Sequence, residues 1–167
     1  MNRRDFMKSV AGSALALALP MPRIVAAECD VKKLIMTGYA AKFAFTDVGS
    51  PPNCFRERIE AGAFDKALAC EHDIHCVVNF CPDMMLGSTK DGTLRLSVDT
   101  TGLRYELDLP DTNLGRYVRE EKSCGNINEG ISFEAAEDDW QWPKDGAAKR
   151  TIASFKRIYD VSLNVKQ

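Results

Sequence analysis

The clearest alternation of hydrophobic and polar positions lies in the middle of the chain. Leu94, Leu96 and Val98 alternate with polar residues, and after a glycine-containing turn the run from Leu103 to Leu109 alternates in the same way. A period of two places every apolar side chain on one face of a strand. The two runs therefore predict a β-hairpin with one buried face.

Most other apolar segments also predict strands. These segments are residues 33–45, 55–59, 74–80, 131–135 and 151–163. The strand at 74–80 is expected to stop at Pro82 and Asp83. The charged segment 137–149 contains Pro143 and Gly146 and predicts either an exposed loop or a ragged hairpin.

Helical spacing is restricted to two short segments. Residues 62–70 carry an apolar face, and a second helix is expected from about Asn113 to Lys122, with Asp111 or Thr112 as its cap. The pattern therefore predicts a mainly β fold of the α+β kind. We expect a small antiparallel β-barrel with flanking helices.

The N-terminus has a different composition from the rest of the chain. The pair Arg3-Arg4 precedes an apolar run at 10–19 and the small-residue stretch Val25-Ala26-Ala27. This order is typical of a twin-arginine export signal, and the apolar run is shorter than the roughly 20 residues that span a bilayer. We expect a signal peptide at 1–27 and a mature domain at 28–167, with export out of the cytoplasm and no membrane anchor after processing. The alternative is a basic, amphipathic N-terminal helix of a cytoplasmic protein.

Charge and cysteine usage narrow the range of partners and cofactors. The net charge is −2 and no basic stripe occurs, which argues against binding of nucleic acid. The six cysteines are irregularly spaced and form no CxxC pair, so we predict neither a metal site nor a cofactor. One or two disulfides and free buried thiols remain equal alternatives.

Six short segments, in order, resemble those of one family. They are Gly38–Phe43, the pair Phe55–Ile59 and Gly62–Phe64, the pair Leu86–Thr89 and Gly92–Leu94, the pair Gly102–Leu103 and Leu109–Thr112, Gly130–Phe133, and Tyr159–Ser162. Each is weak evidence alone, but together they resemble the prohead serine proteases of tailed phages. The resemblance runs from about Leu34 to Ser162.

The resemblance implies both a fold and a function. It implies a β-barrel similar to that of the herpesvirus capsid proteases, and a serine endopeptidase that cleaves the scaffold part of a phage capsid protein inside the procapsid. Ser132 matches the family's nucleophile. Asp160 is a candidate for the third catalytic group, the alternative being a surface carboxylate at a strand end. The family continues past the segment that ends at Ser162, so a truncated C-terminus is expected.

One departure from the family affects the chemistry directly. Where the family has an Asn-His-Asp triplet that supplies the catalytic base, this chain has Asn79-Phe80-Cys81. Phenylalanine accepts no proton, and the loss of the base in a triad hydrolase lowers turnover by a factor of about 10⁴–10⁶.

Histidine, cysteine and lysine are the other residue types that could supply a base or a nucleophile. His75 precedes Phe80 by five residues on one predicted strand, so it is expected about 16 Å from Phe80, on the opposite face. Cys81 as a replacement nucleophile would lack a base, and a lysine base could not be located. The alternatives to a protease are an inactive relative and an exported β-domain with a binding role. The oligomeric state is left open.

Overall fold

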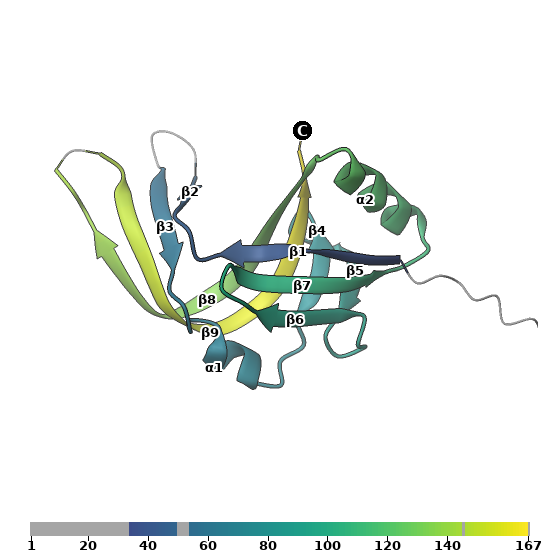
Figure 1. Ribbon diagram of the computed structural model, residues 1–167, viewed down its shortest axis with the longest axis horizontal. Helices are drawn as coiled ribbons and strands as arrows, with labels where there is room; N and C mark the ends of the chain where they lie inside the picture. Colours follow the sequence, from purple (N-terminus) through teal and green to yellow (C-terminus); the bar gives the residue numbers. More distant parts are fainter. Residues whose placement is uncertain (1–33, 50–53, 145, 167) are drawn as a thin grey trace, which may run out of the picture. The chain divides into compact units, whose positions relative to one another are not determined.

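Two β-sheets account for most of the chain that the computed structural model describes, which is residues 34–49, 54–144 and 146–166 (Figure 1). These residues belong to the unit Lys32–Gln167. The predicted signal peptide at 1–27 lies outside the described residues, so it stays a prediction. The mainly β class is confirmed.

The smaller sheet contains the predicted hairpin. Its strands, in spatial order, are β1 (Leu34–Lys42), β7 (Gly102–Leu109) and β6 (Leu94–Val98), and both pairings are antiparallel. Along β7, Leu103, Tyr105 and Leu107 are fully buried, as the alternation predicts.

The larger sheet is organised around one long strand, β9 (Ala148–Val165). The other strands are β2 (Thr46–Val48), β3 (Phe55–Ile59), β4 (His75–Val78), β5 (Cys81–Ser88) and β8 (Ile127–Gln141). β9 pairs with β8 over nearly its full length on one side, and with β3 and then β4 on the other. The segment 137–149 therefore forms the end of the β8–β9 hairpin, one of the two alternatives expected.

The predicted antiparallel barrel needs correction. Among the described residues no closed barrel is found, and β3 and β4 run parallel to β9. The short helix α1 (Asp65–Ala69) lies between β3 and β4, so both strands reach the same side of β9 with the same direction. Period-two alternation fixes which face of a strand is buried, but it does not fix the partner or the direction of pairing.

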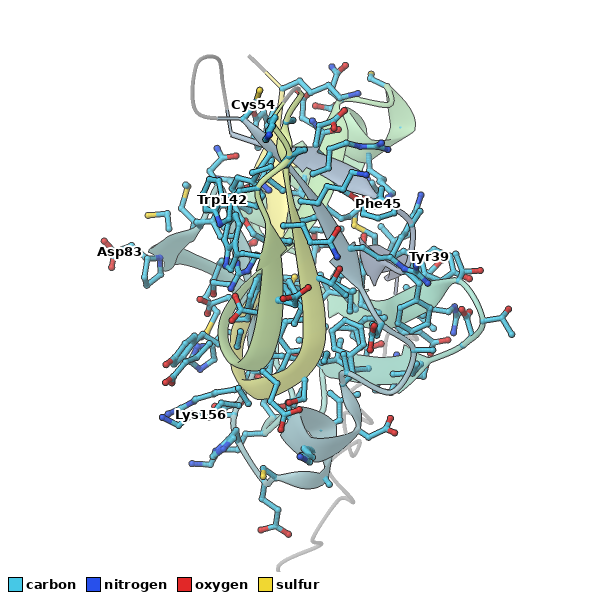
Figure 2. All side chains as sticks on the ribbon, turned by 90° about the vertical axis from the view of Figure 1, so that its left-hand side faces the viewer. Tyr39, Phe45, Cys54, Asp83, Trp142 and Lys156 are labelled. Atoms are coloured by element: carbon cyan, nitrogen blue, oxygen red, sulfur yellow. The ribbon has the colours of Figure 1, made fainter. Side chains whose placement is uncertain are left out.

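The predicted strand at 74–80 also needs correction. β4 ends at Val78, and Asn79 and Phe80 form a turn with φ values of 52° and 54°. Pro82 and Asp83 do not end a strand but lie within β5, at the edge of the sheet, where a proline removes no ladder hydrogen bond; Asp83 projects away from the sheet (Figure 2).

Aromatic rings fill the centre of the core. Phe64, which precedes α1, stacks on Phe155 of β9 with 4.8 Å between ring centroids, and Phe133 of β8 packs edge-on against Phe155 at the same distance. Phe64 and Phe155 are almost fully buried. Burial of each such side chain stabilises the fold by about 1.5–3 kcal/mol.

The second helix begins where the sequence predicts. α2 (Asn113–Ser123) is capped by Thr112, whose hydroxyl accepts a hydrogen bond from the Gly115 N–H at 3.1 Å. Its buried face includes Val118. Such a cap contributes about 1 kcal/mol because it satisfies an N–H that has no partner within the helix.

The described residues were predicted to hold either disulfides or free thiols, and the cysteines among them are free. Cys54, Cys70, Cys76, Cys81 and Cys124 are all free thiols. In the described part of the chain, no helix is long and apolar enough to cross a membrane. The same residues contain no cluster of three or more side chains suited to hold a metal ion.

Gly102 provides a test of the contact between β1 and β7. A Cβ at this position would lie 2.1 Å from the Ala41 carbonyl oxygen, so Gly102→Ala would push the two backbones apart. We expect a loss of about 2–3 kcal/mol in the free energy of unfolding, measured by urea denaturation. The matched control is Gly92→Ala, where φ is +75° and no atom lies within 4 Å, so only backbone strain of about 1 kcal/mol is added. Equal losses in the two variants would contradict the predicted close approach.

Candidate functional site

Three neighbouring strands bring Ser132, Asp160 and His75 into one row. Ser132 of β8 is paired with Asp160 of β9, and Asp160 is paired on its other side with His75 of β4. Directly paired residues share a face of the sheet, so the three side chains project from the same face. The sequence indicated Ser132 and Asp160 as site residues, and the structure brings these two together.

The contacts within this row have a definite order. The Ser132 hydroxyl donates a hydrogen bond to Oδ2 of Asp160 at 2.7 Å. The Nδ1 atom of His75 lies 3.6 Å from Oδ1 of Asp160, and Nε2 of His75 lies 3.3 Å from Oδ2 of Asp73. The Asp160 side chain is 24% exposed and that of His75 is 43% exposed. The site is thus a half-buried line, Ser132–Asp160–His75–Asp73.

This order differs from that of a serine hydrolase triad. In a triad the imidazole contacts the serine hydroxyl and the carboxylate lies behind the imidazole. Here the carboxylate of Asp160 contacts the hydroxyl of Ser132, and the imidazole of His75 lies behind the carboxylate. A carboxylate is a much weaker base than an imidazole, so this arrangement orients Ser132 but activates it poorly.

Asp73 anchors the far end of the row. Desolvation by itself would raise the pKa of Asp73, but hydrogen bonds from the Lys90 backbone N–H and the Ser88 hydroxyl, together with the neighbouring His75, outweigh it and lower the pKa. Asp73 is therefore a carboxylate at neutral pH. It presents negative charge to the imidazole on the side opposite Asp160.

The expected distance of about 16 Å between His75 and Phe80 rested on a single straight strand from residue 74 to residue 80. That premise is wrong, because β4 ends at Val78 and the chain turns at Asn79 and Phe80. It also left out the parallel pairing of β4 with β9, which sets His75 opposite Asp160. Sequence reasoning missed Asp73 for the same reason, and no local pattern in the sequence indicates this strand pairing.

Phe80 occupies a constrained position beside the same row. Its backbone N–H donates to the Ser162 hydroxyl at 2.8 Å, and its ring lies 3.2 Å from the point that a Cβ of Gly130 would occupy. Gly130 and Ser132 are two residues apart on β8 and face the same side. The side chain at position 80 therefore lies over the part of β8 that carries Ser132.

The Phe80 backbone adopts an unfavourable conformation. Asn79 and Phe80 both have positive φ, as in the tight two-residue turns that favour asparagine and glycine. The turn is held by the Asn79 side chain, whose Oδ1 accepts a hydrogen bond from the Val165 N–H at 2.9 Å. A bulky residue in this region is an outlier that costs about 1–3 kcal/mol, and such strain is concentrated at functional sites.

Cys76, the neighbour of His75 on β4, does not provide a substitute nucleophile. Burial, with a smaller contribution from the charge of Asp160, raises the pKa of Cys76 to about 12. Cys76 is therefore an unreactive thiol at neutral pH. Cys81, the other candidate, lies on β5 and is partly buried.

A cleft of about 690 Å³ is lined in part by β8, although Ser132, Asp160, His75 and Asp73 are not among its lining residues. Gly130 and Phe133, which flank Ser132 on β8, contribute to its lining, together with Phe80, Tyr39 and Arg150. The cleft therefore lies along the segment of β8 that carries the serine, and it offers both apolar and charged groups to a bound chain.

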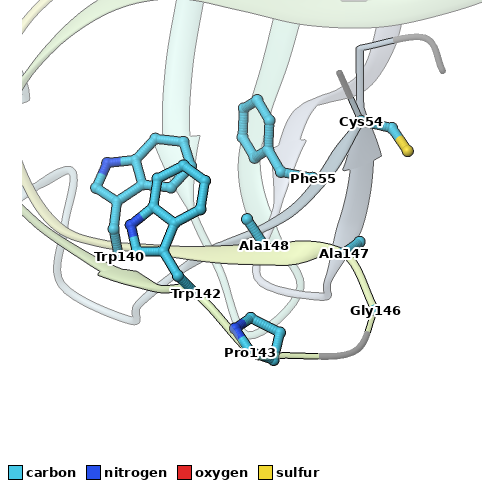
Figure 3. A pocket seen from close by; sticks show the side chains of 8 residues that line it. All are labelled: Cys54, Phe55, Trp140, Trp142, Pro143, Gly146, Ala147 and Ala148. Atoms are coloured by element: carbon cyan, nitrogen blue, oxygen red, sulfur yellow. The ribbon is translucent and has the colours of Figure 1, made fainter. Parts of the chain in front are cut away.

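A second cavity, of about 650 Å³, lies at the tip of the β8–β9 hairpin (Figure 3). Trp140 stacks on Trp142 with 5.4 Å between ring centroids, Phe55 packs against Trp140 at 5.0 Å, and Trp142 is 76% exposed. Apart from the thiol of Cys54, its lining residues carry no titratable side chain. The acid–base and nucleophilic groups are thus gathered at Ser132 and not at this aromatic surface.

The fold and the site together define a mainly β protein in which the hydroxyl of a strand-borne serine donates a hydrogen bond to a carboxylate. Comparison with known proteins identifies the family. A profile of the caudovirus prohead serine proteases matches residues 23–165, so the chain belongs to this family. No curated protein and no solved structure matches the chain. The catalytic roles of Ser132 and Asp160 remain predictions.

Cysteine reactivity tests the environment beside Asp160. Because its raised pKa keeps Cys76 protonated up to about pH 12, we expect iodoacetamide at pH 8 to leave Cys76 unmodified in the folded protein. The exposed Cys54, Cys70 and Cys124 are expected to react, as read by peptide mass spectrometry. The same treatment in urea should modify Cys76 and serves as the control. Modification of native Cys76 at the rate of Cys124 would show that its burial is wrongly described.

Proposed function

We propose that this chain engages the scaffold part of a tailed-phage capsid protein and cleaves it far more slowly than a protease with a complete triad. Membership of the prohead serine protease family supports the substrate class. The observation that carries the reduced rate is the bond from the Ser132 hydroxyl to the Asp160 carboxylate at 2.7 Å. The resemblance to the family implies that the residue at position 80 supplies the base, and here that residue is phenylalanine.

The chemical argument concerns one proton. Attack on a peptide carbonyl forms a bond from the serine oxygen to the carbonyl carbon, and the hydroxyl proton must leave as this bond forms. Asp160 is placed to accept it, but a carboxylate gives little driving force for this transfer at neutral pH. His75, the nearer of the two histidines by chain position to the predicted base, faces Asp160 and Asp73 instead. Slow acylation is the expected result.

Binding of a scaffold segment does not require the catalytic base that its cleavage requires. The cleft of about 690 Å³ beside Gly130 and Phe133 is of a size that accommodates several side chains of a peptide. We propose that this cleft receives the scaffold segment next to Ser132. The proposed place of action is the procapsid, as the family implies. The alternative is a location outside the cytoplasm, to which the export signal predicted at 1–27 would direct the chain.

Restoring the base should restore the reaction. In Phe80→His an imidazole would lie over the same part of β8 as the phenyl ring now does, within two residues of Ser132. A general base contributes about 10²–10⁴ in rate, so we expect Phe80→His to cleave a co-expressed capsid precursor at least 10²-fold faster than the unaltered chain. Gel analysis and mass spectrometry of the products measure this.

Two variants control for indirect effects. Phe80→Leu keeps an apolar side chain and should cleave no faster than the unaltered chain. Ser132→Ala in the Phe80→His background should abolish the recovered cleavage. Efficient cleavage by the unaltered chain that is lost on Ser132→Ala would refute the proposed slow rate. A folded Phe80→His protein that still does not cleave would refute the role assigned to position 80.

A further inference from the structure

We propose that His75 is a positioning residue, which holds the Asp160 carboxylate in the orientation that accepts the Ser132 hydrogen bond. The proposal rests on the proposed function, because His75 acts on Ser132 only through Asp160. It assigns a role to a histidine that lies outside the family segments from which the catalytic residues were inferred.

The two oxygens of Asp160 face opposite neighbours. Oδ2 accepts the bond from Ser132 of β8, whereas Oδ1 faces Nδ1 of His75 on β4 at 3.6 Å. The terminal torsion of an aspartate is soft, so the carboxylate alone does not define which oxygen the serine meets. A cation or N–H donor on one side and a hydroxyl donor on the other restrict that torsion from both sides.

His75 is in turn held from behind. Its Nε2 lies 3.3 Å from Oδ2 of Asp73, and the other oxygen of Asp73 accepts a hydrogen bond from the Lys90 backbone N–H at 3.1 Å. Thr89 also donates to Oδ1 of Asp73, at 3.4 Å. Asp73 is thus tied to the turn that follows β5, which leaves the imidazole little freedom to swing away.

The groups around the imidazole are complementary in charge. Asp73 faces it from the segment before β4 and Asp160 faces it from β9, while Ser88 of β5 is paired with it across the sheet. A ring with protons on both nitrogens can donate to both carboxylates. Removal of the ring would leave two carboxylates facing one gap, and their repulsion would turn Asp160 away from Ser132 toward solvent.

A pair of substitutions distinguishes positioning from simple packing. The side-chain nitrogen of asparagine falls close to the place of an imidazole Nδ1, and that of glutamine close to Nε2. His75→Asn therefore keeps a donor toward Asp160, whereas His75→Gln keeps one only toward Asp73. If His75 only filled space, asparagine, the smaller of the two, would not be the better replacement. If His75 positions Asp160, asparagine should be the better one.

The first measurement is the reactivity of Ser132 in the Phe80→His protein. We expect its rate of modification by a fluorophosphonate, followed by intact mass, to fall at least 10-fold in His75→Gln. His75→Asn should keep the rate within about 3-fold. His72→Gln is the matched control, since among the described residues the His72 side chain has no hydrogen-bond or ion-pair partner, and it should leave the rate unchanged. Equal losses for His75→Asn and His75→Gln would overturn the proposal.

The second measurement does not depend on reactivity. The chain has only two histidines, so long-range ¹H–¹⁵N spectra of the unaltered protein resolve His75 once His72→Gln has assigned the other ring. Asp160→Asn should shift the Nδ1 resonance of His75 and leave His72 unchanged. One outcome is that the Nδ1 resonance of His75 shifts in Asp160→Asn while Phe80→His stays unreactive. That result would refute the proposed function but would support the contact between His75 and Asp160. If the Nδ1 resonance of His75 does not shift in Asp160→Asn, the positioning role is overturned.

Discussion

The pairing of β9 with strands on both of its sides is the constraint on which the rest of the structure depends. Its 18 residues span the full length of the larger sheet, with β8 on one side and β3 and β4 on the other. The aromatic core is built on it through Phe155, and the site through Asp160. A change that shifted its register by one residue would remove Asp160 from Ser132 and Phe155 from the core together.

The turn at Asn79 and Phe80 is where we propose that the site departs from its family. A phenylalanine with positive φ is costly. The turn is held by hydrogen bonds from the Phe80 N–H to the Ser162 hydroxyl, from the Val165 N–H to Asn79 Oδ1, and from the Asn79 N–H to the Leu163 carbonyl oxygen. The turn carries the side chain at position 80 over Gly130 of β8. Under the proposed function, a histidine at this position would act as a base for Ser132, whereas the phenyl ring of Phe80 accepts no proton.

The parts of the fold that follow from local chemistry could be predicted from the sequence. The hairpin of β6 and β7 follows from strict alternation, and the start of α2 follows from the capping hydroxyl of Thr112. The parallel partners of β9, which are β3 and β4, could not be predicted, because parallel pairing between distant segments leaves no periodic signal. The ordered segments indicated Ser132 and Asp160, whereas Asp73 and His75 become part of the site only through the pairing of β4 with β9.

The same geometry explains why His75 meets Asp160 and not Ser132. Neighbouring strands lie about 4.8 Å apart, so β4 and β8, which flank β9, are separated by about 9.6 Å with Asp160 between them. An imidazole on β4 therefore meets the carboxylate before it can reach the serine. The turn after Val78, by contrast, leaves the sheet and carries the side chain at position 80 over β8, next to Gly130. For the proposed function, position 80 is therefore better placed than position 75 to supply a base to Ser132.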